Sequence, residues 1–158
     1  MRVFGVSVVG IIVATLLYYI FEFFWYGVAF QDAWQIGNGV SESDYQGNEI
    51  IWMAVGFVAP LAQVIALAFI LKWFGWPSLA ESINKILLLA ILMGAGTSIY
   101  MYAYMPHHST AVFLIDWFHI IIGWLIAAIV LTFLRPKYIA PVKKAYQTRE
   151  EPEVFYED

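Results

Sequence analysis

The chain has 158 residues, of which 62% are hydrophobic and 13% are charged, and its mean hydropathy is +0.74. These values exceed what the core of a soluble domain requires, so they exclude a soluble protein. The formal charge of −4 at pH 7 gives no support to nucleic-acid binding. The absence of cysteine excludes disulfide exchange, thiolate catalysis and cysteine-ligated metal centres.

Four apolar stretches follow one another along the chain, and each reaches the ~20 residues that an α-helix needs to cross a bilayer. They cover residues 3–30, 50–71, 83–104 and 111–134. Residues 1–134 therefore predict an all-α, integral membrane four-helix bundle, and residues 135–158 predict a charged cytoplasmic tail. Because this bundle uses up most of the chain, we expect no separate catalytic domain and no enzyme activity.

All the Lys and Arg residues fall on one side of this four-span arrangement, whereas the connections 31–49 and 105–110 contain none. Basic loops are retained in the cytoplasm. Both termini and the 72–85 connection are therefore predicted to be cytoplasmic, in a multi-pass protein of the bacterial cytoplasmic (inner) membrane. The basic residues are Arg2, Lys72, Lys85, Arg135, Lys137, Lys143, Lys144 and Arg149.

Aromatic residues near the expected span ends are typical of anchors at the membrane interface. Between the first two spans, segment 31–49 is polar and rich in turn-forming residues, which predicts an exposed loop. Before the third span, Ser78 and Glu81 match the capping box that starts a helix. The expected interface anchors are Trp25, Tyr26, Trp34, Trp73 and Trp76.

Small residues recur at four-residue intervals in the third and fourth spans. Such a stripe lets a neighbouring helix backbone approach closely. We expect these stripes to pack the bundle itself rather than a partner subunit. They consist of Ala90, Gly94 and Ser98 in the third span and Gly123 and Ala127 in the fourth.

Glu22, Asp116 and His119 are ionisable residues at membrane depth, where such groups are costly and are functional by default. At ~1.5 Å rise per residue, all three lie in the outer leaflet. Asp116 and His119 are three positions apart and share a helix face. Glu22 can complete the cluster from across the bundle. The sequence therefore predicts a candidate ligand- or proton-binding site at these three residues.

Three interpretations of this cluster remain open. In the first, Asp116 and His119 join His107 and His108 of the adjacent loop to bind zinc, iron or copper. In the second, the cluster is the proton-linked or substrate-binding site of a small oligomeric carrier. In the third, the groups hydrogen-bond one another and hold the bundle together. The sequence identifies no cofactor, and a bis-histidine haem is disfavoured because His119 is the only histidine well inside a span.

Further residues resemble a bacterial family of small four-span membrane proteins that is known only as a domain of unknown function. In that family, a Trp-Tyr pair at the end of the first helix is followed by Phe and Ala-Trp. This chain departs from the pattern at Glu22, where a small residue is more usual, and at Val28, where Pro often stands. The matching residues are Phe23-Phe24-Trp25-Tyr26-Gly27, Phe30, Ala33-Trp34, Gly56-Phe57, Phe74-Gly75-Trp76, Ser78-Leu79-Ala80, Ile115-Asp116 and Phe118-His119.

The resemblance implies an inner-membrane protein with four helices, and it carries no activity, substrate or cofactor. We therefore expect a small accessory or interaction subunit of a larger membrane complex. A small oligomeric carrier or a ligand- or metal-binding membrane protein is the alternative. The expected partners are the lipid bilayer and either a larger membrane complex or further copies of the chain.

Overall fold

The computed structural model describes residues 2–41, 44, 49–104 and 109–136. Within them, four helices are long and apolar enough to cross a membrane, which confirms the predicted all-α four-helix arrangement. The elements in chain order are β1 (Arg2–Val3), β2 (Val6–Ser7), α1 (Val8–Phe24), the π-helix η1 (Trp25–Ala29), α2 (Gln31–Asn38), α3 (Glu49–Trp73), α4 (Leu79–Tyr104) and α5 (Thr110–Phe133).

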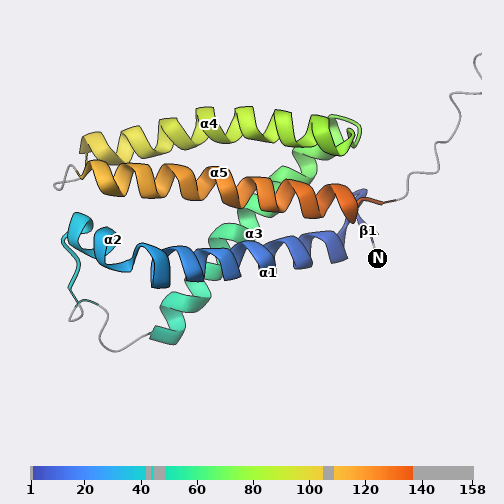
Figure 1. Ribbon diagram of the computed structural model, residues 1–158. Helices are drawn as coiled ribbons and strands as arrows, with labels where there is room; N and C mark the ends of the chain where they lie inside the picture. Colours follow the sequence, from blue (N-terminus) through green and yellow to red (C-terminus); the bar gives the residue numbers. More distant parts are fainter. Residues whose placement is uncertain (1, 42–43, 45–48, 105–108, 137–158) are drawn as a thin grey trace, which may run out of the picture.

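Helix α5 is the central helix, because it contacts α1, α3 and α4. Figure 1 shows α4, α5 and α1 side by side, while α3 crosses behind α5 and α1 at a steep angle. We call the end of the bundle where α3 turns into α4 the basic end, and the opposite end, where α2 lies, the α2 end. Helix α1 continues through η1 toward the α2 end, where α4 also finishes and α5 begins.

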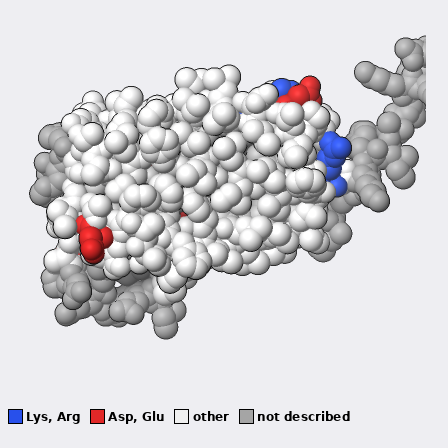
Figure 2. Space-filling model, in the orientation of Figure 1, with Lys and Arg blue, Asp and Glu red and all other residues white. Residues whose placement is uncertain are grey.

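On the face of the bundle shown in Figure 2, charged side chains gather at the two ends. In Figure 2, blue Lys and Arg atoms occur only at the basic end, and the band between the ends is almost entirely uncharged. Lys72 donates a hydrogen bond to the Phe4 carbonyl oxygen, and Arg135 donates to the carbonyl oxygens of Trp76 and Pro77. Such a band is what a bilayer requires of the helices that cross it.

The start of the chain differs from the prediction, because α1 begins at Val8 rather than at Val3. Strands β1 and β2 pair in an antiparallel hairpin. Phe4 and Gly5 form its turn with φ values of 49° and 78°, a combination typical of tight two-residue hairpin turns. The Ser7 hydroxyl then accepts a hydrogen bond from the Gly10 backbone N–H and caps α1.

The connection between α3 and α4 follows the predicted capping chemistry. Gly75, with φ 74°, ends α3 in the left-handed conformation that glycine favours. The backbone N–H of Ser78 donates to a Glu81 carboxylate oxygen over 3.0 Å, and the Glu81 N–H donates back to the Ser78 hydroxyl. This capping box is confirmed, and it starts α4 at Leu79, one turn before the predicted apolar stretch 83–104 begins.

Residues Gln31–Asn38 form α2, whereas the sequence predicted an exposed loop. The helix ends at Gly39, whose φ is 66°. Gly37 lies against the start of α5, because a Cβ atom added to Gly37 would be only 2.4 Å from the Val112 Cγ2 atom. Docking on α5 therefore stabilises a short helix that its own propensity would not.

The core lies where α1, α3 and α5 meet. Tyr18 of α1, Leu67 and Leu71 of α3, and Leu131 of α5 are almost completely buried there. The small residues Ala90, Gly94 and Ser98 of α4 are also buried, and the Gly94 backbone packs against the side chains of Trp117 and Ile120 in α5.

Candidate functional site

An ionisable pair joins α1 to α5 inside the bundle. The Nε2 atom of His119 lies 3.5 Å from a carboxylate oxygen of Glu22, and the exposed fractions of the two side chains are 8% and 17%. Among the described residues, Nε2 has no hydrogen-bond partner. The separation exceeds the usual 2.7–3.2 Å of an N–H···O hydrogen bond. The two groups are therefore an acid and a base in close proximity, without a tight bond between them.

Four aromatic rings of the α1–η1 segment surround the imidazole of His119. The Phe21 ring stacks on it, with centroids 5.5 Å apart and planes 6° from parallel, and the Tyr26 ring centroid is 4.7 Å away. Tyr18 and Trp25 lie at 5.6 Å and 6.4 Å. Rings at this range stabilise a positive charge through their π faces. The ring faces around His119 therefore offset part of the cost that burial adds to the imidazolium form.

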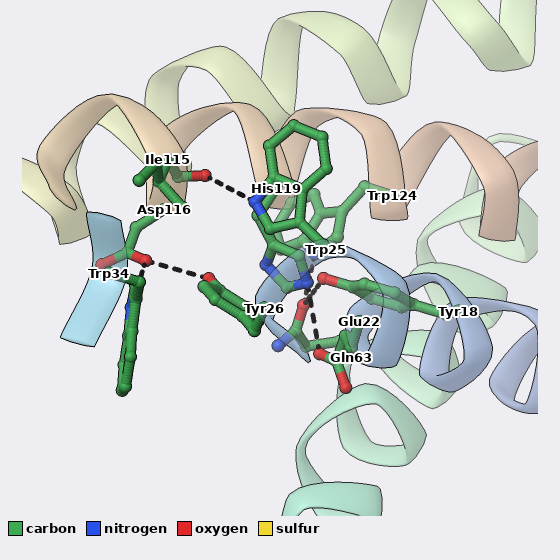
Figure 3. A network of polar contacts seen from close by, with 10 residues as sticks. All are labelled: Tyr18, Glu22, Trp25, Tyr26, Trp34, Gln63, Ile115, Asp116, His119 and Trp124. Carbon is green, nitrogen blue, oxygen red and sulfur yellow. Dashed lines mark hydrogen bonds and ion pairs between the residues drawn. The ribbon is translucent and has the colours of Figure 1, made fainter. Parts of the chain in front are cut away.

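Gln63 brings the third helix, α3, into the same region. Its side-chain oxygen accepts a hydrogen bond from the Tyr18 hydroxyl over 3.0 Å and another from the Trp124 indole N–H. Tyr18 lies against Gly123, and a Cβ atom at that position would come within 2.0 Å of the Tyr18 ring. The missing side chain of Gly123 thus leaves the space that the Tyr18 ring occupies. Figure 3 shows Tyr18 beside Gln63.

Asp116 connects α5 to η1 and α2 at the α2 end of the network. One of its carboxylate oxygens accepts hydrogen bonds from the Tyr26 hydroxyl over 2.9 Å and from the Trp34 indole N–H over 3.2 Å. The indole N–H of Trp25 donates to the Ile115 carbonyl oxygen over 3.2 Å. Figure 3 shows Tyr26 between Asp116 and His119, so one tyrosine contacts both ionisable groups of α5.

The π-helical turn η1 is the segment that supplies Trp25 and Tyr26 to this network. Its closing hydrogen bond runs from the Phe30 N–H to the Trp25 carbonyl oxygen, five residues earlier. Single π-turns within helices occur frequently at functional sites. Here the turn joins α1 to α2, the helix that carries Trp34.

A small cavity of about 30 Å³ lies beside Asp116 at the α2 end. Among its lining residues, the Ser98 hydroxyl is buried without a hydrogen-bond partner in the described part of the chain. The volume and polarity suit a water molecule. The lining residues are Asn38, Ser98, Met101, Tyr102, Ser109, Val112, Phe113 and Asp116.

The three predicted site residues are therefore linked, but not in the pairing that helix spacing suggested. Asp116 bonds to Tyr26 and Trp34, whereas His119 faces Glu22. No three His, Asp or Glu residues among those described are close enough to hold one metal ion. His107 and His108, the other two ligands of the metal hypothesis, lie outside the described residues.

A family model for proteins of unknown function, designated DUF1761, matches residues 9–132, most of the chain. The chain belongs to the DUF1761 family. No curated protein and no solved structure shows significant similarity to it. The DUF1761 match includes every residue of the network described above and stops before the charged tail.

Sequence reasoning on this DUF1761 chain missed Tyr18, Gln63 and Trp124 as members of the network. The available signal was Gln63, an amide at membrane depth in the second span, because such a group needs hydrogen-bond partners from neighbouring helices. Three of the expected interface anchors, Trp25, Tyr26 and Trp34, use their polar atoms inside the bundle. Trp73 is 78% exposed at the basic end, and Trp76 follows Gly75 in the turn there.

Proposed function

We propose that this DUF1761 protein is a small multi-pass membrane protein that binds a proton reversibly at the Glu22–His119 pair. The observation that carries the proposal is the 3.5 Å separation of an imidazole and a carboxylate within a bilayer-spanning bundle. The pair stays neutral overall whether its proton is on the carboxyl group or on the imidazole. Gain or loss of a further proton changes the charge at membrane depth, where ionisable groups are usually functional.

The pairing geometry favours proton binding over a purely structural role. Gln63 and Asp116 each accept two hydrogen bonds, and these bonds join α1, α2, α3 and α5. The Glu22–His119 contact is longer, and Nε2 of His119 lacks a hydrogen bond within the described residues. The structural links are thus made by other groups, and the pair is free to change its protonation without breaking them.

The polar cavity next to Asp116 supports proton access from the α2 end. Asp116 lines the cavity and accepts a hydrogen bond from Tyr26, whose ring lies against His119. Water in the cavity would therefore be separated from the pair by one carboxylate and one tyrosine. Protein and water hydroxyl groups can both donate and accept hydrogen bonds along such a path.

The same proposal includes a location and an orientation. The basic end faces the cytoplasm of a bacterial cell and the α2 end faces outward across the cytoplasmic membrane. Lys72, Lys85 and Arg135, all at the basic end, support this orientation. The proton site then takes its protons from the outside.

Nitrogen-15 NMR of labelled histidine in the full-length protein in lipid nanodiscs tests proton binding. We expect His119 to change its protonation state within the pH range over which the protein stays folded, and the Glu22→Gln substitution to shift that change. Glu22→Asp should restore part of the original behaviour. Glu81→Gln, which removes an exposed carboxylate at the basic end, is the matched control and should leave His119 unchanged. A His119 resonance that stays in one protonation state across this range contradicts the proposal.

A second candidate function, an interaction subunit of a larger membrane complex, is favoured by one face of α3. Val55, Ala59, Ala62 and Ala66 are all exposed and recur at the spacing of one helix face. Small side chains of this kind let another membrane helix approach closely. The occupant would be a partner subunit or a second copy of the chain.

Cross-linking in native membranes tests this second function. Ala62→Cys and Ala66→Cys should give cross-linked products, whereas Ala111→Cys, at an exposed position in the first turn of α5, should not. The mass of the gently solubilised particle then distinguishes a larger complex from a homo-oligomer. A monomer that cross-links at none of these positions rules out the interaction function.

A further inference from the structure

An apolar cavity of about 400 Å³ lies at the basic end, between the last turns of α3 and the first turns of α4. Its volume is within the ~300–1,000 Å³ typical of small-molecule sites. Six of its seven lining residues are apolar, and the seventh is Lys85. The lining residues are Ile70, Trp73, Phe74, Lys85, Leu88, Leu89 and Leu92.

The course of α3 explains why a cavity forms there. After their connecting turn, α3 and α4 diverge, because α3 crosses behind α5 while α4 packs beside it (Figure 1). The cavity opens on the outer surface of the bundle, since Trp73, Phe74, Leu88 and Leu92 are each more than half exposed. In a bilayer, this surface faces the hydrocarbon chains of lipids.

The ammonium group of Lys85 lies at this cavity, and no carboxylate among the described residues is within ion-pair distance of it. Its Nζ atom is 4.8 Å from the centroid of the Phe74 ring. Glu81 lies one helical turn earlier, but its carboxylate accepts the backbone N–H and the hydroxyl of Ser78. Lys72 and Arg135, by contrast, donate to backbone carbonyl oxygens. Among the residues that line the cavity, Lys85 is the cation, and its ammonium group can reach an anion from outside the protein.

We infer that this cavity binds an anionic phospholipid from the surrounding bilayer. One acyl chain occupies the apolar cavity, and Lys85 pairs with the phosphate. The flexible stem of lysine lets its charged end reach toward the headgroup layer while its methylene groups line apolar surface. Basic pockets between membrane helices on the cytoplasmic side bind anionic headgroups in this way. The inference is independent of proton binding at the other end of the bundle.

Native mass spectrometry of the full-length protein tests the inference, with phosphatidylglycerol and phosphatidylcholine of identical acyl chains offered together. We expect the parent protein to retain phosphatidylglycerol preferentially. Lys85→Gln should lower that preference about fivefold, since one lysine near a membrane surface contributes about 1 kcal/mol. Lys72→Gln removes the same charge from the same end without altering the cavity, so its preference should stay close to that of the parent.

A second pair of variants tests the apolar half of the site without changing charge. Leu88→Trp fills the cavity and should reduce retention of both lipids, whereas Leu16→Trp, on the exposed face of α1, should not. Equal losses for Lys85→Gln and Lys72→Gln would indicate diffuse surface charge and overturn the inference. Equal retention of the two lipids by the parent, or a lipid-free dimer mass, would overturn it as well.

Discussion

Gly123 is the residue on which the polar network most directly depends, because the Tyr18 ring occupies the space of its missing side chain. A Cβ atom there would lie 2.0–2.7 Å from three Tyr18 ring carbons. Tyr18 is fully buried and bonded to Gln63, so it has little room to move. The ring and the glycine therefore form one unit in the packing of α1 against α5.

Gly123→Ala should accordingly lower the free energy of unfolding in mixed micelles by about 1–3 kcal/mol, the usual cost of overpacking a core. Gly96→Ala is the control, since no atom lies within 4 Å of the position of its added Cβ. Denaturation followed by circular dichroism measures both variants. Equal stability of the two would show that Tyr18 can move away from Gly123 without cost.

The Tyr26 hydroxyl donates one hydrogen bond to Asp116. Removing this hydroxyl group measures how much that hydrogen bond contributes to stability. Tyr26→Phe should lower the free energy of unfolding by about 0.6 kcal/mol, the average for hydrogen bonds between membrane helices, and by no more than about 1.7 kcal/mol, the largest value. Tyr100→Phe, at a tyrosine that is 62% exposed, should change stability much less. If both substitutions have the same effect, the bond from Tyr26 to Asp116 adds nothing to stability.

The sequence predicted that Asp116 and His119 share a helix face and that Glu22 completes the cluster from across the bundle. In the structure His119 lies beside Glu22, whereas Asp116 bonds to Tyr26 and Trp34. Asp116 and His119 are three positions apart, yet that spacing still separates their directions by about 60° around the helix. Asp116 consequently faces η1 and α2, and His119 faces α1. Which helix stands in each direction depends on the packing of the whole bundle, and spacing within one span carries no information about it.

At the scale of elements, α2 shows how tertiary contacts override local composition. The segment Gln31–Asn38 is polar and contains Gly37, so its composition favours a loop. The side chains of Val112 and Ser109 pack against Gly37, and Trp34 bonds to Asp116. Gly37 thus provides a contact surface for α5. A single sequence does not distinguish such a glycine from one that forms a turn.

Gly37→Ala should undock α2 from α5. If the substitution lowers the free energy of opening α2 by about 1–3 kcal/mol, amide hydrogen exchange across residues 31–38 should become roughly 5- to 150-fold faster. Gly27→Ala, where the nearest side-chain atoms are 4.0 Å from the added Cβ, should leave exchange in this segment unchanged. Unaltered exchange in Gly37→Ala would mean that α2 is stable without its contact with α5.

At the scale of the whole molecule, hydropathy determined the class of fold, since each span is a long apolar stretch and the bilayer permits few alternatives. The sequence did not predict in the same way which helices pack against one another. Lipid-facing and buried residues are equally apolar in these helices, so no amphipathic face indicates that α5 is central or that α3 crosses obliquely. The small residues Gly94 and Gly123 mark close contacts but not the identity of the helix they contact.

The lack of cysteine in the chain makes the proposed orientation simple to measure. Asp32→Cys places a thiol on exposed α2, and Ala80→Cys places one at the start of α4. A membrane-impermeant maleimide should label Asp32→Cys in intact cells and Ala80→Cys only after the membrane is opened. The reverse pattern would place the basic end outside.

The central position of α5 also has a consequence for biogenesis, because this helix follows the other three candidate spans in the chain. Glu22 enters the membrane with the first span, but its partner His119 arrives only with the fourth. Until then the carboxyl group has no imidazole beside it, and isolated polar groups in hydrocarbon are costly. The Glu22 carboxyl group is therefore expected to contact water or other polar groups rather than lipid until α5 has been synthesised.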